Sequence, residues 1–186
     1  MSQLNEILEF NKSFVESKEY LKYSADKYPN KKIVILSCMD TRLTELLPKA
    51  LNLKNGDAKI IKNAGAVITH PFGSIARSIL VAIYELKAEE VFIIGHHGCG
   101  MSKVDYDKTL ENIYKRGIKE ETINNLTHSG IDLKKWFEGF SCIYDSVKET
   151  VSKMKNHPLM PANIKIHGLV MDPKTAKLEL VVDDNK

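Results

Sequence analysis

Residues 31–38 read KKIVILSC, a short apolar run rich in β-branched residues that leads directly into the polar stretch MDTR at residues 39–42. Two later runs have a similar character, AKIIKN at residues 58–63 and EEVFIIGH at residues 89–96. Short continuous apolar runs are typical of strands that are buried on both faces of a parallel sheet. We therefore predict three such strands at the centre of the fold.

Helical patterns separate these predicted strands. Residues 71–86 read PFGSIARSILVAIYEL, in which Gly73 and Ser74 can begin a helix. Ile79 and Ile83 belong to an apolar stripe on one face of this helix. A strand, a helix and a second strand in succession predict parallel pairing, because parallel strands need a crossover connection of this kind.

The first part of the chain predicts a helical arm. Residues 4–21 carry apolar side chains at near-helical spacing and follow Ser2, a candidate N-cap. The whole chain has 186 residues, of which 43% are hydrophobic, which is enough for one core but short for two. We therefore expect a single domain over residues 1–186, with residues 1–30 as an N-terminal helical arm.

The last part of the chain predicts helices and then two strands. Residues 106–156 are mostly helical in pattern, with breaks near Gly130 and Gly139. Residues 164–172 and 177–184 follow as a closing pair of strands. The expected fold class is α/β, with a parallel-core β-sheet, flanking helices and an antiparallel edge strand.

Charge and cysteine content exclude several classes of function. Lys and Arg number 27 against 24 Asp and Glu, and they are scattered, so we expect no nucleic-acid partner. No apolar run approaches a membrane span, and the start lacks the basic region and unbroken apolar core of a signal peptide. We therefore expect a cytoplasmic protein with no membrane partner. The three cysteines form an odd set for disulfides, so metal binding or catalysis is the better interpretation.

The residues that follow each predicted strand are those that can carry chemistry. In an open parallel sheet, ligands bind outside the carboxyl ends of the strands. These positions hold Cys38, Asp40 and Arg42 after the first strand, Asn63, Ala64 and Gly65 after the second, and His96 and Cys99 after the third. Two thiols, an imidazole and a carboxylate are therefore expected at one edge of the sheet.

Two thiolates and one imidazole are a preferred donor set for zinc, and three protein ligands leave a fourth position open, as in catalytic sites. Cysteine is often no more than a small buried residue, and Asp40 with Arg42 could be an ordinary surface ion pair. The coincidence of suitable donors at two strand ends favours the metal. His97 is an alternative to His96, but a ligand at 96 leaves two residues for the turn to Cys99.

Two motifs in this chain resemble the signature of the β-class carbonic anhydrases, especially the small prokaryotic members. They are Cys38-Met39-Asp40-Thr41-Arg42 and His96-His97-Gly98-Cys99, with Lys62-Asn63-Ala64-Gly65 between them. The resemblance implies Zn²⁺ held by Cys38, His96 and Cys99, and a catalytic pair, Asp40 and Arg42. Asp40 is either paired to Arg42 or the fourth ligand of a closed state. We expect Asn63, Ala64 and Gly65 to contact the substrate.

The activity that the resemblance implies is the reversible hydration of carbon dioxide to bicarbonate and a proton. Zinc lowers the pKa of bound water from about 15.7 towards about 7, which supplies hydroxide as the nucleophile at neutral pH. The resemblance also implies a homodimer or higher even oligomer, in which the N-terminal amphipathic helix packs on the partner. Two alternatives stay open. One is a carbon disulfide or carbonyl sulfide hydrolase with the same site, and the other is a zinc protein without catalysis.

Overall fold

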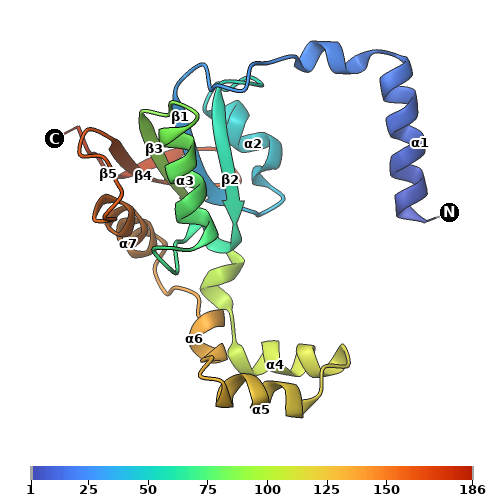
Figure 1. The fold of residues 1–186 in the computed structure, drawn as a ribbon, viewed down its shortest axis with the longest axis vertical. Coiled ribbons are helices and arrows are strands. Elements are labelled where there is room, and N and C mark those ends of the chain that lie inside the picture. Colours follow the sequence, from blue (N-terminus) through green and yellow to red (C-terminus); the bar gives the residue numbers. More distant parts are fainter. Residues whose placement is uncertain (1, 186) are drawn as a thin grey trace.

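The computed structural model describes residues 2–185, so the two ends of the predicted domain, residues 1 and 186, lie outside the described residues. Its centre is one sheet with the strand order β2-β1-β3-β4-β5 (Figure 1). The strands are β1 (Ile33–Cys38), β2 (Ala58–Asn63), β3 (Glu90–His96), β4 (Lys165–Met171) and β5 (Leu178–Val182). Parallel pairing joins the first four, and β5 runs antiparallel to β4. The predicted α/β fold class with an antiparallel edge strand is confirmed.

Helices cover both faces of this sheet. The α-helices of the described chain are α1 (Gln3–Glu16), α2 (Leu43–Ala50), α3 (Ser74–Tyr84), α4 (Tyr106–Lys115), α5 (Glu120–His128), α6 (Leu133–Phe137) and α7 (Ile143–Lys155), and of these α2, α3 and α7 pack on the sheet. On one face α3 and α7 pack over alternate strand residues such as Val34 and Leu36. On the other face α2 packs over Ile35, the residue between them. The central strand β1 is therefore buried on both sides, as its continuous apolar sequence predicts.

Strand β2 departs from the prediction. Its residues were expected to be buried on both faces, but none of them is fully buried, and Ile60 is 41% exposed. The reason is its position, since β2 is the first strand of the sheet and has only β1 beside it. An apolar run does not distinguish an edge strand from a central one.

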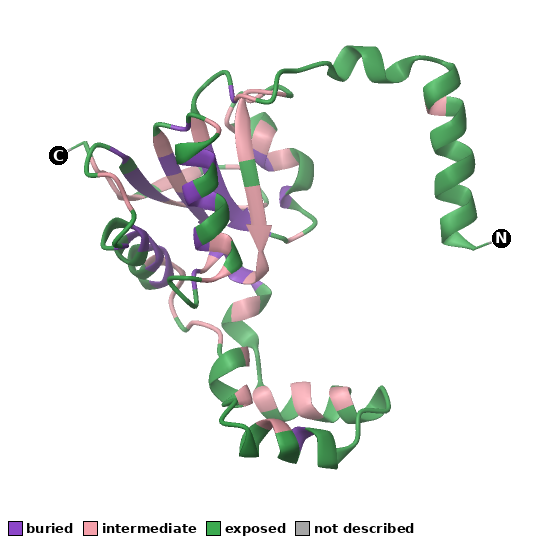
Figure 2. Ribbon diagram, viewed as in Figure 1, coloured by how far each residue is buried: buried purple, intermediate pink, exposed green. Residues whose placement is uncertain are grey.

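Helix α1 begins where the sequence predicts and ends sooner. The Ser2 side chain accepts a hydrogen bond from the backbone N–H of Asn5, as expected for an N-cap. The helix ends at Glu16, and a short 3₁₀ helix (Glu19–Tyr23) follows it. Helix α1 stands apart from the sheet, and none of its residues is buried (Figures 1 and 2). Among residues 2–185, no helix combines the length and apolar character needed to cross a membrane.

Helices α4, α5 and α6 form a projection below the sheet in Figure 1. The predicted breaks near Gly130 and Gly139 are present, because α5 ends at His128 and α6 ends at Phe137. Gly139 lies against the backbone of Met101, and a Cβ at Gly139 would be 1.7 Å from the Met101 carbonyl oxygen. The return segment from the projection therefore packs closely on the loop that follows Cys99.

Candidate metal centre

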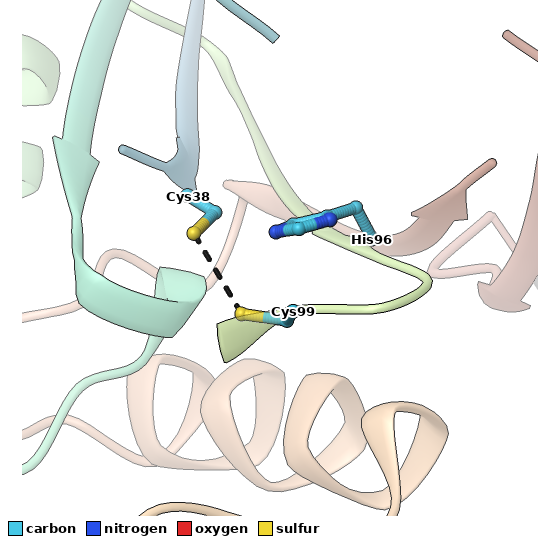
Figure 3. Close-up of side chains that lie close together, drawn as sticks. All are labelled: Cys38, His96 and Cys99. Atoms are coloured by element: carbon cyan, nitrogen blue, oxygen red, sulfur yellow. Dashed lines mark hydrogen bonds between the residues drawn. The ribbon is translucent and has the colours of Figure 1, made fainter. Parts of the chain in front are cut away.

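Three side chains that could hold a metal ion meet at the carboxyl ends of β1 and β3. Cys38 and His96 are the last residues of these adjacent parallel strands, and Cys99 follows on the next turn. Their donor atoms all lie within 4.8 Å of one another, and the two sulfurs are 3.8 Å apart. All three residues are buried. Figure 3 shows the His96 ring directed from the end of β3 towards the sulfurs. We refer to Cys38, His96 and Cys99 as the donor group.

The orientation of His96 leaves one ring nitrogen free for a ligand. Its Nδ1 lies 3.0 Å from the carbonyl oxygen of His97, so Nδ1 carries the proton and donates this hydrogen bond. Its Nε2 is buried and has no hydrogen-bond partner. A buried nitrogen without a partner is costly, and a metal ion would satisfy it. The donor group therefore fits a metal ion in both chemistry and orientation.

The two thiols differ in acidity because their surroundings differ. Burial alone would raise the pKa of Cys38, but a proton taken up by His96 in the metal-free site and the backbone N–H of Gly65 favour the thiolate and lower this pKa to about 7. At Cys99 burial dominates and raises the pKa to about 11, although the backbone N–H of Met101 opposes it. Cys38 is thus the more acidic of the two thiols, and a cation that binds both sulfurs must displace a proton held by the pair.

Asp40 and Arg42 form a two-pronged ion pair beside the donor group. Arg42 Nε and Nη2 donate to the two Asp40 carboxylate oxygens over 2.9 and 2.8 Å. The Arg42 backbone N–H also donates to Asp40, and Arg42 Nη2 reaches the carbonyl oxygen of Gly98 at 3.1 Å. These contacts hold the pKa of Asp40 far below its usual range. The carboxylate is therefore anionic. Its Oδ2 lies 3.8 Å from His96 Nε2, which places this charge next to the donor atoms.

The segment after β2 lies next to this site. Asn63 is in register with Cys38, and the short 3₁₀ helix Ala64–Ala66 follows it. The Asn63 amide nitrogen donates to the Val67 carbonyl oxygen over 2.6 Å, whereas its Oδ1 is buried without a partner. Gly65 supports the Cys38 sulfur through its backbone N–H. This support was not foreseen from the sequence, because any residue except proline offers a backbone N–H and only the folded loop aims it.

His97, the alternative ligand, points elsewhere. Its Nε2 lies 3.5 Å from Glu179 Oε1 on β5, whereas the donor group contains His96. The contribution of His97 to the site is its carbonyl oxygen, which holds His96. No side-chain motif could have signalled this role, because it depends on the path of the backbone.

Comparison with known proteins identifies a family and similar sequences. The family model described as carbonic anhydrase matches residues 33–178. The chain is 61% identical over 183 residues to YtiB of Bacillus subtilis (strain 168), provisionally named a carbonic anhydrase, and the match covers 98% of each chain. It is 31% identical over 163 residues to a carbon disulfide hydrolase of Saccharolobus solfataricus, covering 81% of this chain and 78% of the hydrolase.

A solved structure matches the whole fold. The crystal structure of β-carbonic anhydrase isoform I from Trichomonas vaginalis superposes with a TM-score of 0.90 at 38% sequence identity. The superposition covers 99% of this chain and 100% of that one.

Proposed function

This chain belongs to the β-carbonic anhydrase family, and from that premise we propose that it catalyses the reversible hydration of carbon dioxide to bicarbonate and a proton. One observation carries the proposal, namely a buried donor group whose free His96 Nε2 lies beside the carboxylate of an Asp40–Arg42 pair. The combination provides a metal-binding position and an adjacent anionic hydrogen-bond acceptor.

We propose that the ion is Zn²⁺, held by Cys38, His96 and Cys99. Two thiolates and one imidazole suit this borderline-soft cation, and three protein ligands are the usual number in its catalytic sites. When bound, zinc would lower the pKa of water to about 7 and so make a nucleophile available at neutral pH. The chain itself excludes bulk water from the donors, since all three residues are buried.

Asp40 and Arg42 are proposed to act as an orienting pair. The Asp40 carboxylate is anionic and can accept a hydrogen bond from the attacking group, which would fix the direction of attack. Arg42 holds both carboxylate oxygens and the Gly98 carbonyl, and so restrains Asp40 from turning towards the donors. We propose that the substrate binds next to Asn63, Ala64 and Gly65, because these residues end β2 and follow it beside Cys38.

We also propose a homodimer, or a higher even oligomer, in which α1 packs on a second copy of the chain. Helix α1 exposes Leu4, Ile7, Leu8 and Phe10 by more than half and buries none of its residues (Figure 2). A helix with such an apolar face is stable only when another surface covers it. On this proposal residues 1–186 form one domain with residues 1–30 as an exchanged arm. Sedimentation of the purified chain as a stable monomer with α1 folded would contradict it.

A cytoplasmic location is proposed on the chemistry of the thiols. Cys38 and Cys99 are free cysteines with their sulfurs 3.8 Å apart. Thiols so close together persist in a reducing compartment.

The second candidate is hydrolysis of carbon disulfide or carbonyl sulfide at the same centre. It is favoured by the relative from Saccharolobus solfataricus that is named for the first of these reactions. A zinc protein without catalysis is less well supported, because Arg42 holds the Asp40 carboxylate that would otherwise complete a closed centre.

Stopped-flow measurement of carbon dioxide hydration, together with zinc content, tests the proposal. We expect about one zinc per chain, three protein ligands being the usual catalytic set, and hydration that disappears in Cys99→Ser. Hydrogen sulfide release from carbon disulfide and from carbonyl sulfide is measured on the same preparation. Zinc-loaded protein that releases sulfide but does not hydrate carbon dioxide would favour the second candidate. Zinc-loaded protein inactive on all three gases would favour the non-catalytic alternative.

A further inference from the structure

Three side chains meet beside the turn that leads from His96, at the end of β3, to Cys99. Tyr144, near the start of α7, donates its hydroxyl proton to Glu179 Oε2 over 2.6 Å. Glu179, on β5, places its other oxygen 3.5 Å from His97 Nε2. The His97 ring also meets the Tyr144 ring edge-on, with centroids 5.8 Å apart. We call His97, Tyr144 and Glu179 the loop clamp.

Burial alone does not explain the loop clamp. The side chains of His97 and Glu179 are 38% and 33% exposed, so water could satisfy each of them separately. Instead, the Tyr144 hydrogen bond lowers the pKa of Glu179 and keeps its carboxylate charged towards His97. The three residues come from the β3 loop, α7 and β5, which only the folded chain brings together (Figure 1).

The backbone of His97 connects this clamp to the metal centre. Its carbonyl oxygen accepts the hydrogen bond from His96 Nδ1, which leaves Nε2 free to bind a metal. Its N–H donates to the Met171 carbonyl oxygen over 3.0 Å, which fixes one side of this residue to β4. The next residue is held from the side of the Asp40–Arg42 pair, where Arg42 Nη2 donates to the Gly98 carbonyl oxygen over 3.1 Å. The side chain of His97, through Glu179, is a further anchor of its carbonyl group beside these two contacts.

We propose that Tyr144 and Glu179 are positioning residues that hold His97, and through its carbonyl oxygen hold His96 in the orientation that binds zinc. The inference rests on the proposed function in one respect, because it assumes that the donor group binds zinc. Partners that orient a metal-binding histidine typically change metal affinity by about 10- to 100-fold. Glu179 acts through an intermediate residue and is partly exposed, so we expect a loss near the lower end of that range.

The test compares zinc affinity with the stability of the metal-free protein. Zinc dissociation constants are measured by competition with a chromogenic chelator for the parent chain, Glu179→Ala, Tyr144→Phe and the Glu179→Ala/Tyr144→Phe double variant. Glu111→Ala is the matched control, because Glu111 is an exposed acid whose ion-pair partner within residues 2–185 is Lys115 on the same helix. Thermal unfolding of each metal-free protein reports any general loss of stability.

We expect the dissociation constant to rise by about tenfold in Glu179→Ala, by less in Tyr144→Phe, and not in the control. The double variant should lose no more affinity than Glu179→Ala, since Tyr144 acts through Glu179. Tyr144→Phe removes one hydroxyl group, and its metal-free form should unfold at the parent temperature. Cobalt-substituted protein should show altered absorption bands in Glu179→Ala, as expected if the His96 ligand has moved.

Parental zinc affinity in both single variants would overturn the inference. A loss of unfolding temperature in metal-free Tyr144→Phe with unchanged zinc affinity would also overturn it, because the clamp would then be structural only. Neither comparison uses carbon dioxide hydration. The inference can therefore fail while the proposed activity stands. If the parent binds zinc but does not hydrate carbon dioxide, the zinc affinities of the variants still decide whether Tyr144 and Glu179 position His96.

Discussion

Replacing Arg42 by alanine should separate metal binding from catalysis. The substitution removes two hydrogen bonds to the Asp40 carboxylate and one to the Gly98 carbonyl oxygen. It retains the backbone N–H of residue 42 that donates to Asp40 Oδ1. Asp40 Oδ2 is already only 3.8 Å from His96 Nε2. Without the guanidinium group, a small rotation would bring the carboxylate to the open metal position.

The structure sets the expected size of each effect. The Arg42 side chain is 46% exposed, so its ion pair contributes little to folding, and thermal stability should change only slightly. The donor group is untouched, so zinc content should equal that of the parent. The hydration rate should fall by about 10- to 100-fold, the typical effect of removing a partner that orients groups at a metal site. The hydration rate of Arg42→Lys should lie between those of the parent and of Arg42→Ala, because lysine keeps the charge but cannot donate to both carboxylate oxygens as the planar guanidinium does.

Stopped-flow hydration, zinc analysis and thermal unfolding on the same preparations provide the assay. Arg77→Ala is the control, because Arg77 is an exposed arginine on α3, away from the donor group. A crystal structure of the variant should show Asp40 at about 2.0–2.2 Å from zinc. Full activity in Arg42→Ala would refute the restraining role. Loss of zinc would mean that Arg42 helps to build the centre and is not needed to keep it open.

The remaining predictions concern the donors, their protons and the close contact behind them. Replacing any one member of the donor group by serine or alanine should abolish stoichiometric zinc by elemental analysis, whereas Cys142→Ser should retain it. Burial raises the pKa of Cys99, so at neutral pH zinc must displace at least one thiol proton. Apparent zinc affinity should therefore increase with pH around neutrality, by about tenfold per pH unit for each proton displaced, and affinity that does not change with pH would contradict a protonated thiol in the metal-free site. Gly139→Ala should destabilise the fold by about 1–3 kcal/mol in chemical denaturation, because its Cβ would lie 1.7 Å from a backbone oxygen, while Gly100→Ala enters open space and should be neutral.

The sequence by itself determined the strands and the residues at their ends. The apolar runs of β1 and β3 predict these strands directly, because a strand buried on both faces needs continuous apolar side chains. Once those strands were expected to be parallel, their carboxyl ends had to share one edge of the sheet. That was sufficient to predict that Cys38, His96 and Cys99 would stand near one another, and the chemistry of the three donors indicated a metal.

Tertiary structure decided what depends on neighbours that are distant in the sequence. Strand β2 looks like a central strand in its composition, but the sheet order places it at the edge and leaves Ile60 partly exposed. The free Nε2 of His96 depends on the backbone carbonyl of His97, and the acidity of Cys38 depends partly on the backbone N–H of Gly65. Almost every residue has the same backbone N–H and carbonyl groups, so the residue type does not predict which of them contacts the site. Their directions depend on contacts with residues that are distant in the sequence, such as the hydrogen bond from the His97 N–H to Met171 on β4 and the position of Gly65 against Met101 and Phe140. Long-range packing therefore orients these groups, and local sequence does not.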